Sequence, residues 1–141
     1  MTKFVIATHG YFAKGLKMST EFIMGKRNDL YAICAYTPEC KDFPKAVKTI
    51  INNNKGDIVF GTDIAGGSVN TDLQKIVASS DRLHLVAGIN LPFLLQFLTS
   101  NETNVSEVIN KSIEAAKEGI VNFDNLNTET SKDALDDFDS F

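Results

Sequence analysis

Tryptophan is absent from this sequence, and cysteine, histidine and proline are scarce, with two, two and three residues respectively. The two cysteines, Cys34 and Cys40, lack the number and the spacing of a disulfide scaffold or a zinc site, so we interpret them as free thiols in a reducing compartment. No apolar run is long enough to span a bilayer, and the short run before Thr8 lacks the form of a secretory signal. Together, these absences predict a cytoplasmic protein without a metal site.

Basic residues are scarce in only one part of the chain, its C-terminal end. From residue 124 onward there are six acidic residues and one lysine, a net charge of −5, whereas the preceding residues carry 12 acidic and 13 basic side chains, a net charge of +1. The body therefore lacks the basic surface that a nucleic-acid partner needs. We expect one domain over residues 1–124 and a loosely ordered acidic tail over residues 125–141. Three apolar residues of this tail could dock as a short helix: Leu135, Phe138 and Phe141.

Apolar segments of strand length alternate with segments of helical periodicity along the body. Four segments are predicted strands: residues 3–8, 30–35, 57–62 and 82–87. The predicted helices cover residues 11–24, the segment between the N-cap Asp42 and Gly56, residues 69–79, Asn90 through Leu98, and Asn104 through Ala116, where Asn104 and Glu107 resemble a capping box. The run Ile120–Phe123 is a candidate fifth strand. This alternation predicts an α/β fold with an open, mainly parallel sheet and helices on both faces.

Right-handed crossovers restrict how these strands assemble. If the second strand lies on one side of the first and the third strand on the other, the order in the sheet is 2-1-3-4. A crevice then opens at the carboxyl ends of the first and third strands, where open α/β sheets bind ligands. His9 follows the first strand and Asp63 follows the third. We therefore expect these two side chains to face each other across the crevice.

These residue types suit one kind of chemistry. A neutral imidazole is a nucleophile through one ring nitrogen, and Asp63 would fix the tautomer of His9 and stabilise positive charge on its ring. The segment after Asp63 leads through two glycines into a helix, whose first N–H groups bind anions. The residues expected to bind the anion share backbone or hydroxyl donors: Thr62, Gly66, Gly67 and Ser68. This combination predicts a phosphohistidine.

Two stretches, THGYFAKGL from Thr8 and GTDIAGGSVN from Gly61, resemble the enzyme IIA component of the mannose class of the bacterial phosphoenolpyruvate-dependent sugar phosphotransferase system. The family pattern has His-Gly after one strand and, after a later strand, Asp followed by Gly-Gly-Ser/Thr-Pro. The stretch AGINLPFLLQFL, which follows the fourth predicted strand, also resembles the family's segment at that position. The likeness covers roughly residues 3–123. Val69 stands where the family usually has proline, which presets helix geometry but adds no chemical group.

The resemblance implies a phosphotransferase that needs no cofactor. His9 would accept a phosphoryl group from the phosphocarrier protein HPr and pass it to a histidine of enzyme IIB, while Asp63 orients the imidazole. Family members are homodimers that exchange a C-terminal strand, for which Ile120–Phe123 is the candidate, and they associate indirectly with the membrane components IIC and IID. Because no IIB domain follows in the sequence, we expect IIB on a separate polypeptide.

Other functions are compatible with the same fold. The phosphoryl-carrying subunit of dihydroxyacetone kinase usually has serine where this chain has Gly10. A flavodoxin-like binding or regulatory module needs hydroxyl residues where Tyr11 and Phe12 stand, and these aromatics would instead form a docking surface or begin the core face of a helix. A histidine phosphatase surrounds its phosphate with arginines, which the motif lacks. Tyr36 and Asn90, near strand ends, could line the crevice, whereas His84, within a predicted strand, is interpreted as a core or sheet-face histidine outside the site.

Overall fold

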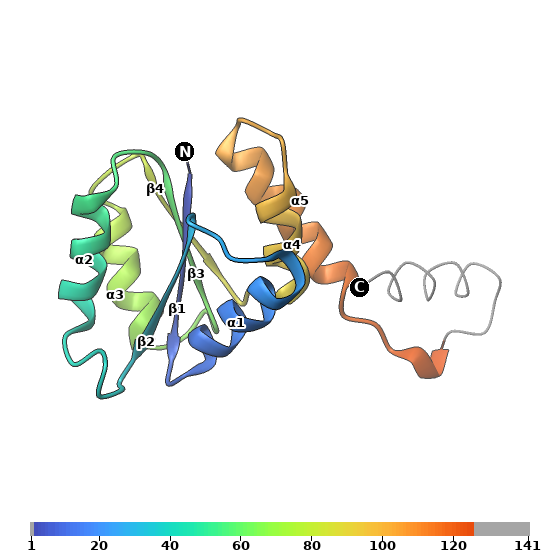
Figure 1. The fold of residues 1–141 in the computed structure, drawn as a ribbon, viewed down its shortest axis with the longest axis horizontal. Helices are drawn as coiled ribbons and strands as arrows, with labels where there is room; N and C mark the ends of the chain where they lie inside the picture. Colours follow the sequence, from blue (N-terminus) through green and yellow to red (C-terminus); the bar gives the residue numbers. More distant parts are fainter. Residues whose placement is uncertain (1, 126–141) are drawn as a thin grey trace.

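Four strands form one parallel sheet in the order β2-β1-β3-β4. The computed structural model describes residues 2–125, and its strand order confirms the predicted one (Figure 1). The strands are β1 (Lys3–His9), β2 (Leu30–Ala35), β3 (Ile58–Thr62) and β4 (Leu83–Ala87). The helices are α1 (Phe12–Met24), α2 (Phe43–Asn53), α3 (Ser68–Val77), α4 (Leu91–Thr99) and α5 (Val105–Glu118). A helix connects each strand to the next, as parallel pairing requires.

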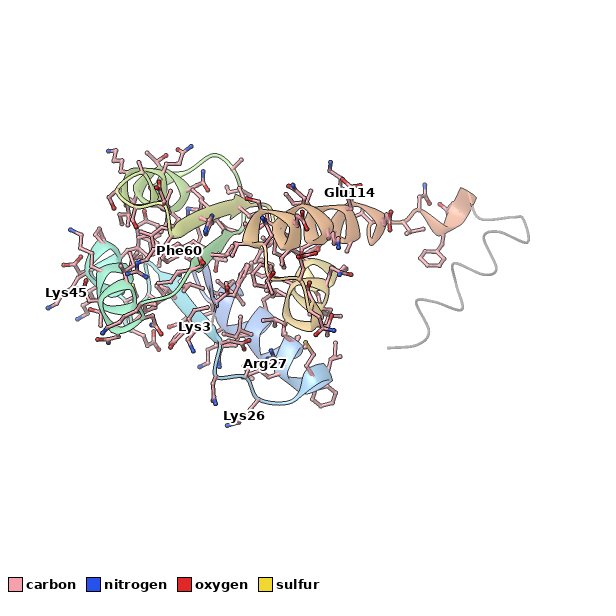
Figure 2. All side chains as sticks on the ribbon, turned by 90° about the horizontal axis from the view of Figure 1, so that it is seen from above. Lys3, Lys26, Arg27, Lys45, Phe60 and Glu114 are labelled. Carbon is pink, nitrogen blue, oxygen red and sulfur yellow. The ribbon has the colours of Figure 1, made fainter. Side chains whose placement is uncertain are left out.

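Helices cover both faces of the sheet (Figure 1). Phe4 and Ile6 of β1 pack on the side of α1, α4 and α5, whereas Val5 and Ala7 pack on the side of α2 and α3. All four side chains are fully buried, which explains why β1 is a continuous apolar run rather than an alternating one. Seen from above, Phe60 of β3 lies between the helix layers (Figure 2). Among the described residues, none of the helices combines the length and the apolar character that a membrane span requires.

The predicted helix starts are confirmed at three N-caps. Asp42 accepts a hydrogen bond from the N–H of Lys45, and Asn90 does the same for Phe93. Asn104 accepts from the N–H of Glu107, as expected, but the capping box is not closed by Glu107. The carboxylate of Glu102 accepts the Asn104 N–H instead, at 3.4 Å. The N–H of Asn104 at the start of α5 is therefore satisfied by Glu102, a residue that the capping-box motif does not contain.

The segment after α5 differs from the prediction. Residues 120–122 have no regular secondary structure, and Phe123–Asn125 forms a 3-10 turn in place of a strand. A strand exists only where its backbone finds a neighbouring edge, and this segment does not pair with the sheet of its own chain. Exchange with a second chain remains a prediction. The tail over residues 126–141, including its three apolar residues, lies outside the described residues.

Candidate active site

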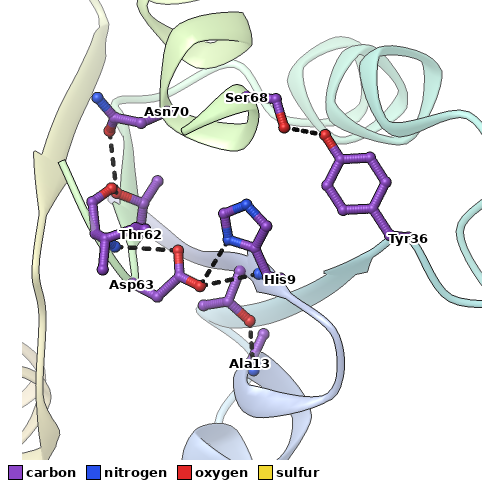
Figure 3. Close-up of polar contacts among 9 residues, drawn as sticks. His9, Ala13, Tyr36, Thr62, Asp63, Ser68 and Asn70 are labelled. Carbon is purple, nitrogen blue, oxygen red and sulfur yellow. Dashed lines mark hydrogen bonds and ion pairs between the residues drawn. The ribbon is translucent and has the colours of Figure 1, made fainter. Parts of the chain in front are cut away.

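The carboxyl ends of β1 and β3 bring His9 and Asp63 together, as the strand order predicted (Figure 3). β1 and β3 are paired in parallel up to Ala7 and Thr62. Beyond this point β1 continues along β2 to His9, its last residue, while Asp63 directly follows β3. Asp63 Oδ2 accepts hydrogen bonds from His9 Nδ1 at 2.9 Å and from the His9 backbone N–H at 3.0 Å. Asp63 Oδ1 accepts from the N–H of Ile64 at 3.1 Å. The carboxylate is thus fixed from three directions.

This geometry sets the tautomer of His9. An ionised carboxylate only accepts hydrogen bonds, so Nδ1 carries the proton and Nε2 keeps its lone pair. Partial burial raises the pKa of the Asp63 carboxyl, but the hydrogen bonds from the ring and the backbone of His9 outweigh burial and lower the pKa overall. Asp63 is therefore ionised at neutral pH. The His9 side chain is 38% exposed, which leaves Nε2 accessible to another molecule.

Nε2 faces the N-terminus of α3 across Gly67 (Figure 3). Gly67 caps this helix with a φ of 127°, a conformation that side chains rarely adopt. A Cβ atom at this position would lie 3.3 Å from Cε1 and 3.5 Å from Nε2 of His9. The glycine therefore leaves open the space directly in front of the nucleophilic nitrogen. The first N–H groups of an α-helix have no acceptor within the helix and, with the helix dipole, favour an anion in that space.

The predicted anion-binding residues fall into two groups. Gly66 and Gly67 lie at the start of α3, next to Ser68, whose hydroxyl hydrogen-bonds to that of Tyr36. Thr62 is placed differently from its predicted role: it is fully buried, and its hydroxyl donates to Oδ1 of Asn70 at 3.0 Å. A buried hydroxyl with a partner is not available to a ligand at Nε2. Thr62 instead supports the loop between Asp63 and α3.

Buried hydrogen bonds hold the two loops of the site in place. Asn70 Nδ2 donates to the carbonyl of Ala65 at 3.0 Å. Asn70 therefore joins Thr62 to the loop before α3 that contains Gly66 and Gly67. Thr8, fully buried, accepts the N–H of Ala13 through its hydroxyl at 2.7 Å. This bond satisfies one free N–H at the start of α1, whose N-cap residue offers no side-chain bond. The residue before the histidine is therefore structural, a role that the motif alone did not indicate.

Tyr36 is the site residue that sequence reasoning undervalued. Its ring stacks on the His9 imidazole, with ring centroids 5.7 Å apart and an angle of 29° between the planes. Asn90 and His84 have structural partners instead: Asn90 Nδ2 donates to the carbonyl of Ala116, and His84 Nε2 lies 3.1 Å from Asp57 Oδ1. The backbone at Tyr36 is left-handed, with a φ of 63°, and no sequence motif signals that conformation.

Exposed apolar side chains lie close to His9 and Asp63 in the sequence. Tyr11 and Phe12 follow His9 by two and three residues, Ile64 directly follows Asp63, and each of the three is about half exposed. We name these three side chains the apolar rim. Within residues 2–125, His, Cys, Asp and Glu side chains do not gather into a group of three or more that could hold a metal ion.

Comparisons with known proteins agree with this geometry. The EIIA-man family, described as PTS system fructose IIA component, matches residues 3–116. The PTS system fructose-specific EIIA component of Bacillus subtilis is 27% identical over 96% of this chain and all of its own length. The PTS system mannose-specific EIIAB component of Escherichia coli is 26% identical over 82% of this chain, which spans only 38% of that relative.

A solved structure supports the same assignment. The phosphotransferase system component EIIA from Streptococcus agalactiae superposes with a TM-score of 0.78 at 26% sequence identity, over 88% of this chain and 98% of its own. The family match covers most of the chain, including both the His9 and the Asp63 motif. The chain therefore belongs to the EIIA-man family, the mannose-class enzyme IIA phosphotransferases of the phosphoenolpyruvate-dependent sugar phosphotransferase system, and has a phosphotransfer role in sugar uptake.

Proposed function

We propose that His9 Nε2 accepts a phosphoryl group from phosphorylated HPr and passes it to a histidine of an enzyme IIB. The observation that carries this proposal is the pairing of His9 Nδ1 with Asp63 at 2.9 Å while Nε2 stays open toward the start of α3. A histidine held in this way is a nucleophile with one defined reactive atom. Its exposure allows a histidine of another protein to approach in line.

The transfer step needs no proton acceptor. The Nε2 lone pair attacks the phosphorus atom, and the P–N bond of the donor phosphohistidine breaks with its electron pair going to the donor ring. His9 then carries the phosphoryl group on Nε2 and keeps its proton on Nδ1, so its ring is positively charged. The ionised Asp63 stabilises that charge through the existing hydrogen bond. Transfer to enzyme IIB follows the same step with His9 as the donor.

The start of α3 would hold the phosphoryl oxygens. Backbone N–H groups from Gly66 to Ser68 and the positive end of the helix dipole lie beside Nε2. An anion at such a helix end gains about 0.3–1 kcal/mol from the dipole at an exposed site. We propose Gly66, Gly67 and Ser68 as the phosphoryl-binding residues. Thr62 contributes indirectly, through Asn70 and the loop before the helix.

The apolar rim would form the docking surface for both carrier proteins. Tyr11, Phe12 and Ile64 expose large apolar side chains within three residues of His9 or Asp63 in the sequence, and exposed apolar groups suit brief contacts with successive partners. We also propose a homodimer in which residues 120–123 pair with the partner's β4, because β4 is an edge strand of the sheet. Association with the membrane components IIC and IID would be indirect, through enzyme IIB.

Mass spectrometry of the intact protein tests the proposal. The protein is incubated with phosphoenolpyruvate, enzyme I and HPr, and a control omits HPr. We expect one added phosphoryl group that is acid-labile and HPr-dependent. His9→Ala should abolish the added mass, whereas His84→Ala, which changes the only other histidine, should not. Labelling of the His9→Ala variant, or no labelling of the folded wild type by active carriers, would show that the assignment is wrong.

A further inference from the structure

Tyr36 combines two features that a surface loop residue normally avoids. Its φ of 63° lies in the left-handed region, and it is the only non-glycine residue of the described chain with a positive φ. Its large side chain is nevertheless 64% exposed, so burial of the ring does not offset the cost of this conformation. Strain of this kind persists where the surrounding contacts require it, often at functional sites. The contacts of Tyr36 therefore indicate what the conformation achieves.

Both ends of the Tyr36 side chain touch the site (Figure 3). Its ring stacks on the His9 imidazole, and its hydroxyl bonds to the hydroxyl of Ser68, the first residue of α3. Because Gly67 fixes the start of α3 in front of Nε2, the Tyr36–Ser68 pair lies on the side of His9 that the phosphoryl group must occupy. Asp63 holds the opposite nitrogen. The Asp63 carboxylate thus holds Nδ1 of the imidazole, and the Tyr36 ring packs on one face of it.

The loop that carries Tyr36 is anchored on the other side of the site as well. The hydroxyl of Tyr11 donates to Glu39 Oε2 at 2.8 Å, which joins the loop to the start of α1. Within the loop, the hydroxyl of Thr37 donates to the carbonyl of Cys34 at 2.7 Å. These bonds fix the backbone on both sides of Tyr36. The position of its ring is therefore a property of the folded loop and does not depend on a bound partner.

We propose that Tyr36 is a positioning residue for phosphoryl transfer that acts through Ser68. This inference rests on the proposed function of His9. A phenol is the more acidic of the two hydroxyls, so Tyr36 donates to Ser68 Oγ and leaves the Ser68 proton free to donate to a phosphoryl oxygen on Nε2. Donation from Tyr36 also strengthens the hydrogen bond that Ser68 makes, since linked hydrogen bonds polarise one another. The stacked ring keeps the imidazole plane aligned and covers one of its faces from water.

Two variants and their combination test this role. Tyr36→Phe keeps the ring but removes the hydroxyl, and Ser68→Ala removes the hydroxyl through which Tyr36 acts. The rate of phosphoryl acceptance from phospho-HPr is measured by rapid quench in single turnovers. We expect Tyr36→Phe to slow acceptance by about three- to tenfold, the range for one neutral hydrogen bond, and Ser68→Ala to slow it at least as much. The double variant should be no slower than Ser68→Ala, because Tyr36 loses its target.

A carrier-free assay separates this inference from the proposed function. Phosphoramidate, a small phosphoryl donor, labels histidine without HPr, and the lifetime of the phosphohistidine is then followed by mass spectrometry. We expect Tyr36→Phe to shorten that lifetime by about threefold or more, and Tyr36→Ala, which also lacks the ring, to shorten it further. A role limited to partner docking would alter the dependence on HPr concentration and leave this lifetime unchanged.

Each outcome decides one of the two proposals. If phosphoramidate labels the wild type but phospho-HPr does not, the proposed carrier is wrong, and the lifetimes still decide the role of Tyr36. Lifetimes and acceptance rates of Tyr36→Phe equal to those of the wild type, or effects of Tyr36→Phe and Ser68→Ala that add in the double variant, would overturn the positioning role. Failure of both donors to label His9 would overturn both proposals. Equal melting temperatures of all variants exclude a loss of fold.

Discussion

Asp63 Oδ2 accepts two hydrogen bonds from His9, one from the ring Nδ1 at 2.9 Å and one from the backbone N–H at 3.0 Å. Because both donors belong to one residue, a single oxygen fixes the end of β1 and the orientation of the imidazole together. The ring cannot turn without losing a charge-assisted hydrogen bond. Nε2 is therefore aimed at the start of α3 before a partner binds, which reduces the ordering required during transfer.

Replacing Asp63 with asparagine should remove the carboxylate charge while keeping the hydrogen-bond geometry at His9. The amide oxygen can still accept from the backbone and the ring of His9, so we expect the fold to persist. The positive charge that forms on the imidazole loses its counter-charge, and a hydrogen bond to a charged group contributes about 1.5–3 kcal/mol. Acceptance of the phosphoryl group should therefore slow by roughly 10- to 100-fold in single-turnover measurements with phospho-HPr.

Asp57 provides the matched control for this substitution. It pairs with the second histidine of the chain, with Oδ1 3.1 Å from His84 Nε2, away from the site. Asp57→Asn should leave the rate of phosphoryl acceptance unchanged. An equal loss of rate in both variants would mean that a general electrostatic effect, rather than the contact with His9, slows the Asp63 variant. A normal rate in Asp63→Asn would remove the charge of Asp63 from the mechanism.

The contact between His9 and Asp63 was predictable because it depends on strand order. Continuous apolar runs identify the buried strands, right-handed crossovers restrict their order, and residues that follow neighbouring strands must meet at one edge. The direction of the Thr62 hydroxyl was not predictable in the same way. It depends on Asn70, which reaches back from α3 and offers an acceptor inside the protein. A strand sequence does not show which polar group will lie opposite it.

Tyr36 and residues 120–123 illustrate two further limits of the sequence. The ring of Tyr36 contacts His9 from a left-handed backbone, and a tyrosine gives no local signal for that conformation. The apolar run at residues 120–123 has strand character, but the pairing that makes a strand comes from outside the run. In the described chain the sheet consists of β1 to β4 alone, and the end of this run forms a 3-10 helix. Local pattern therefore predicts an element only where the fold supplies its neighbours.

The hydroxyl of Thr8 should stabilise the fold more than a second hydroxyl that is equally buried. Thr8→Val leaves the N–H of Ala13 without its acceptor, and a buried donor without a partner costs about 1–3 kcal/mol. Thr20→Val removes a hydroxyl that only donates to the carbonyl of Leu16, which already accepts a helical hydrogen bond, so the loss should be much smaller. Urea unfolding followed by circular dichroism measures both. Equal losses would contradict the capping role of Thr8.

Stability at low pH should depend on Asp29. Arg27 donates to both oxygens of this carboxylate, from Nε at 3.0 Å and Nη2 at 2.8 Å. Burial raises the pKa of the Asp29 carboxyl, but the bonds from Arg27 outweigh burial and lower the pKa overall. The folded-state pKa is therefore below the unfolded value of about 3.9. The resulting stabilisation is fully present above that value and is lost as the pH falls through the folded-state pKa.

The Asp29→Asn variant tests this dependence. At pH 7 it should lower the free energy of unfolding by about 1.5–3 kcal/mol, the contribution of a hydrogen bond to a charged group. As the pH falls through the folded-state pKa, the wild type is itself protonated at this position, so the two proteins should converge. Asp81→Asn, at an exposed position, is the control and should follow the wild type at every pH. A constant difference between Asp29→Asn and the wild type across this range would contradict the assigned role of the carboxylate.

A methyl group at Gly67 should block phosphoryl acceptance more than it destabilises the fold. The added Cβ would lie 3.5 Å from His9 Nε2, in the space where the phosphoryl group must bind, and the φ of 127° would add backbone strain of about 1–3 kcal/mol. Gly15→Ala in α1 is the matched control, because its Cβ would meet no atom within 4 Å and the residue has no part in the site. Single-turnover assays should show acceptance nearly abolished in Gly67→Ala and almost unchanged in Gly15→Ala. If Gly67→Ala accepts the phosphoryl group at a normal rate, the group binds on a different side of the imidazole from the start of α3.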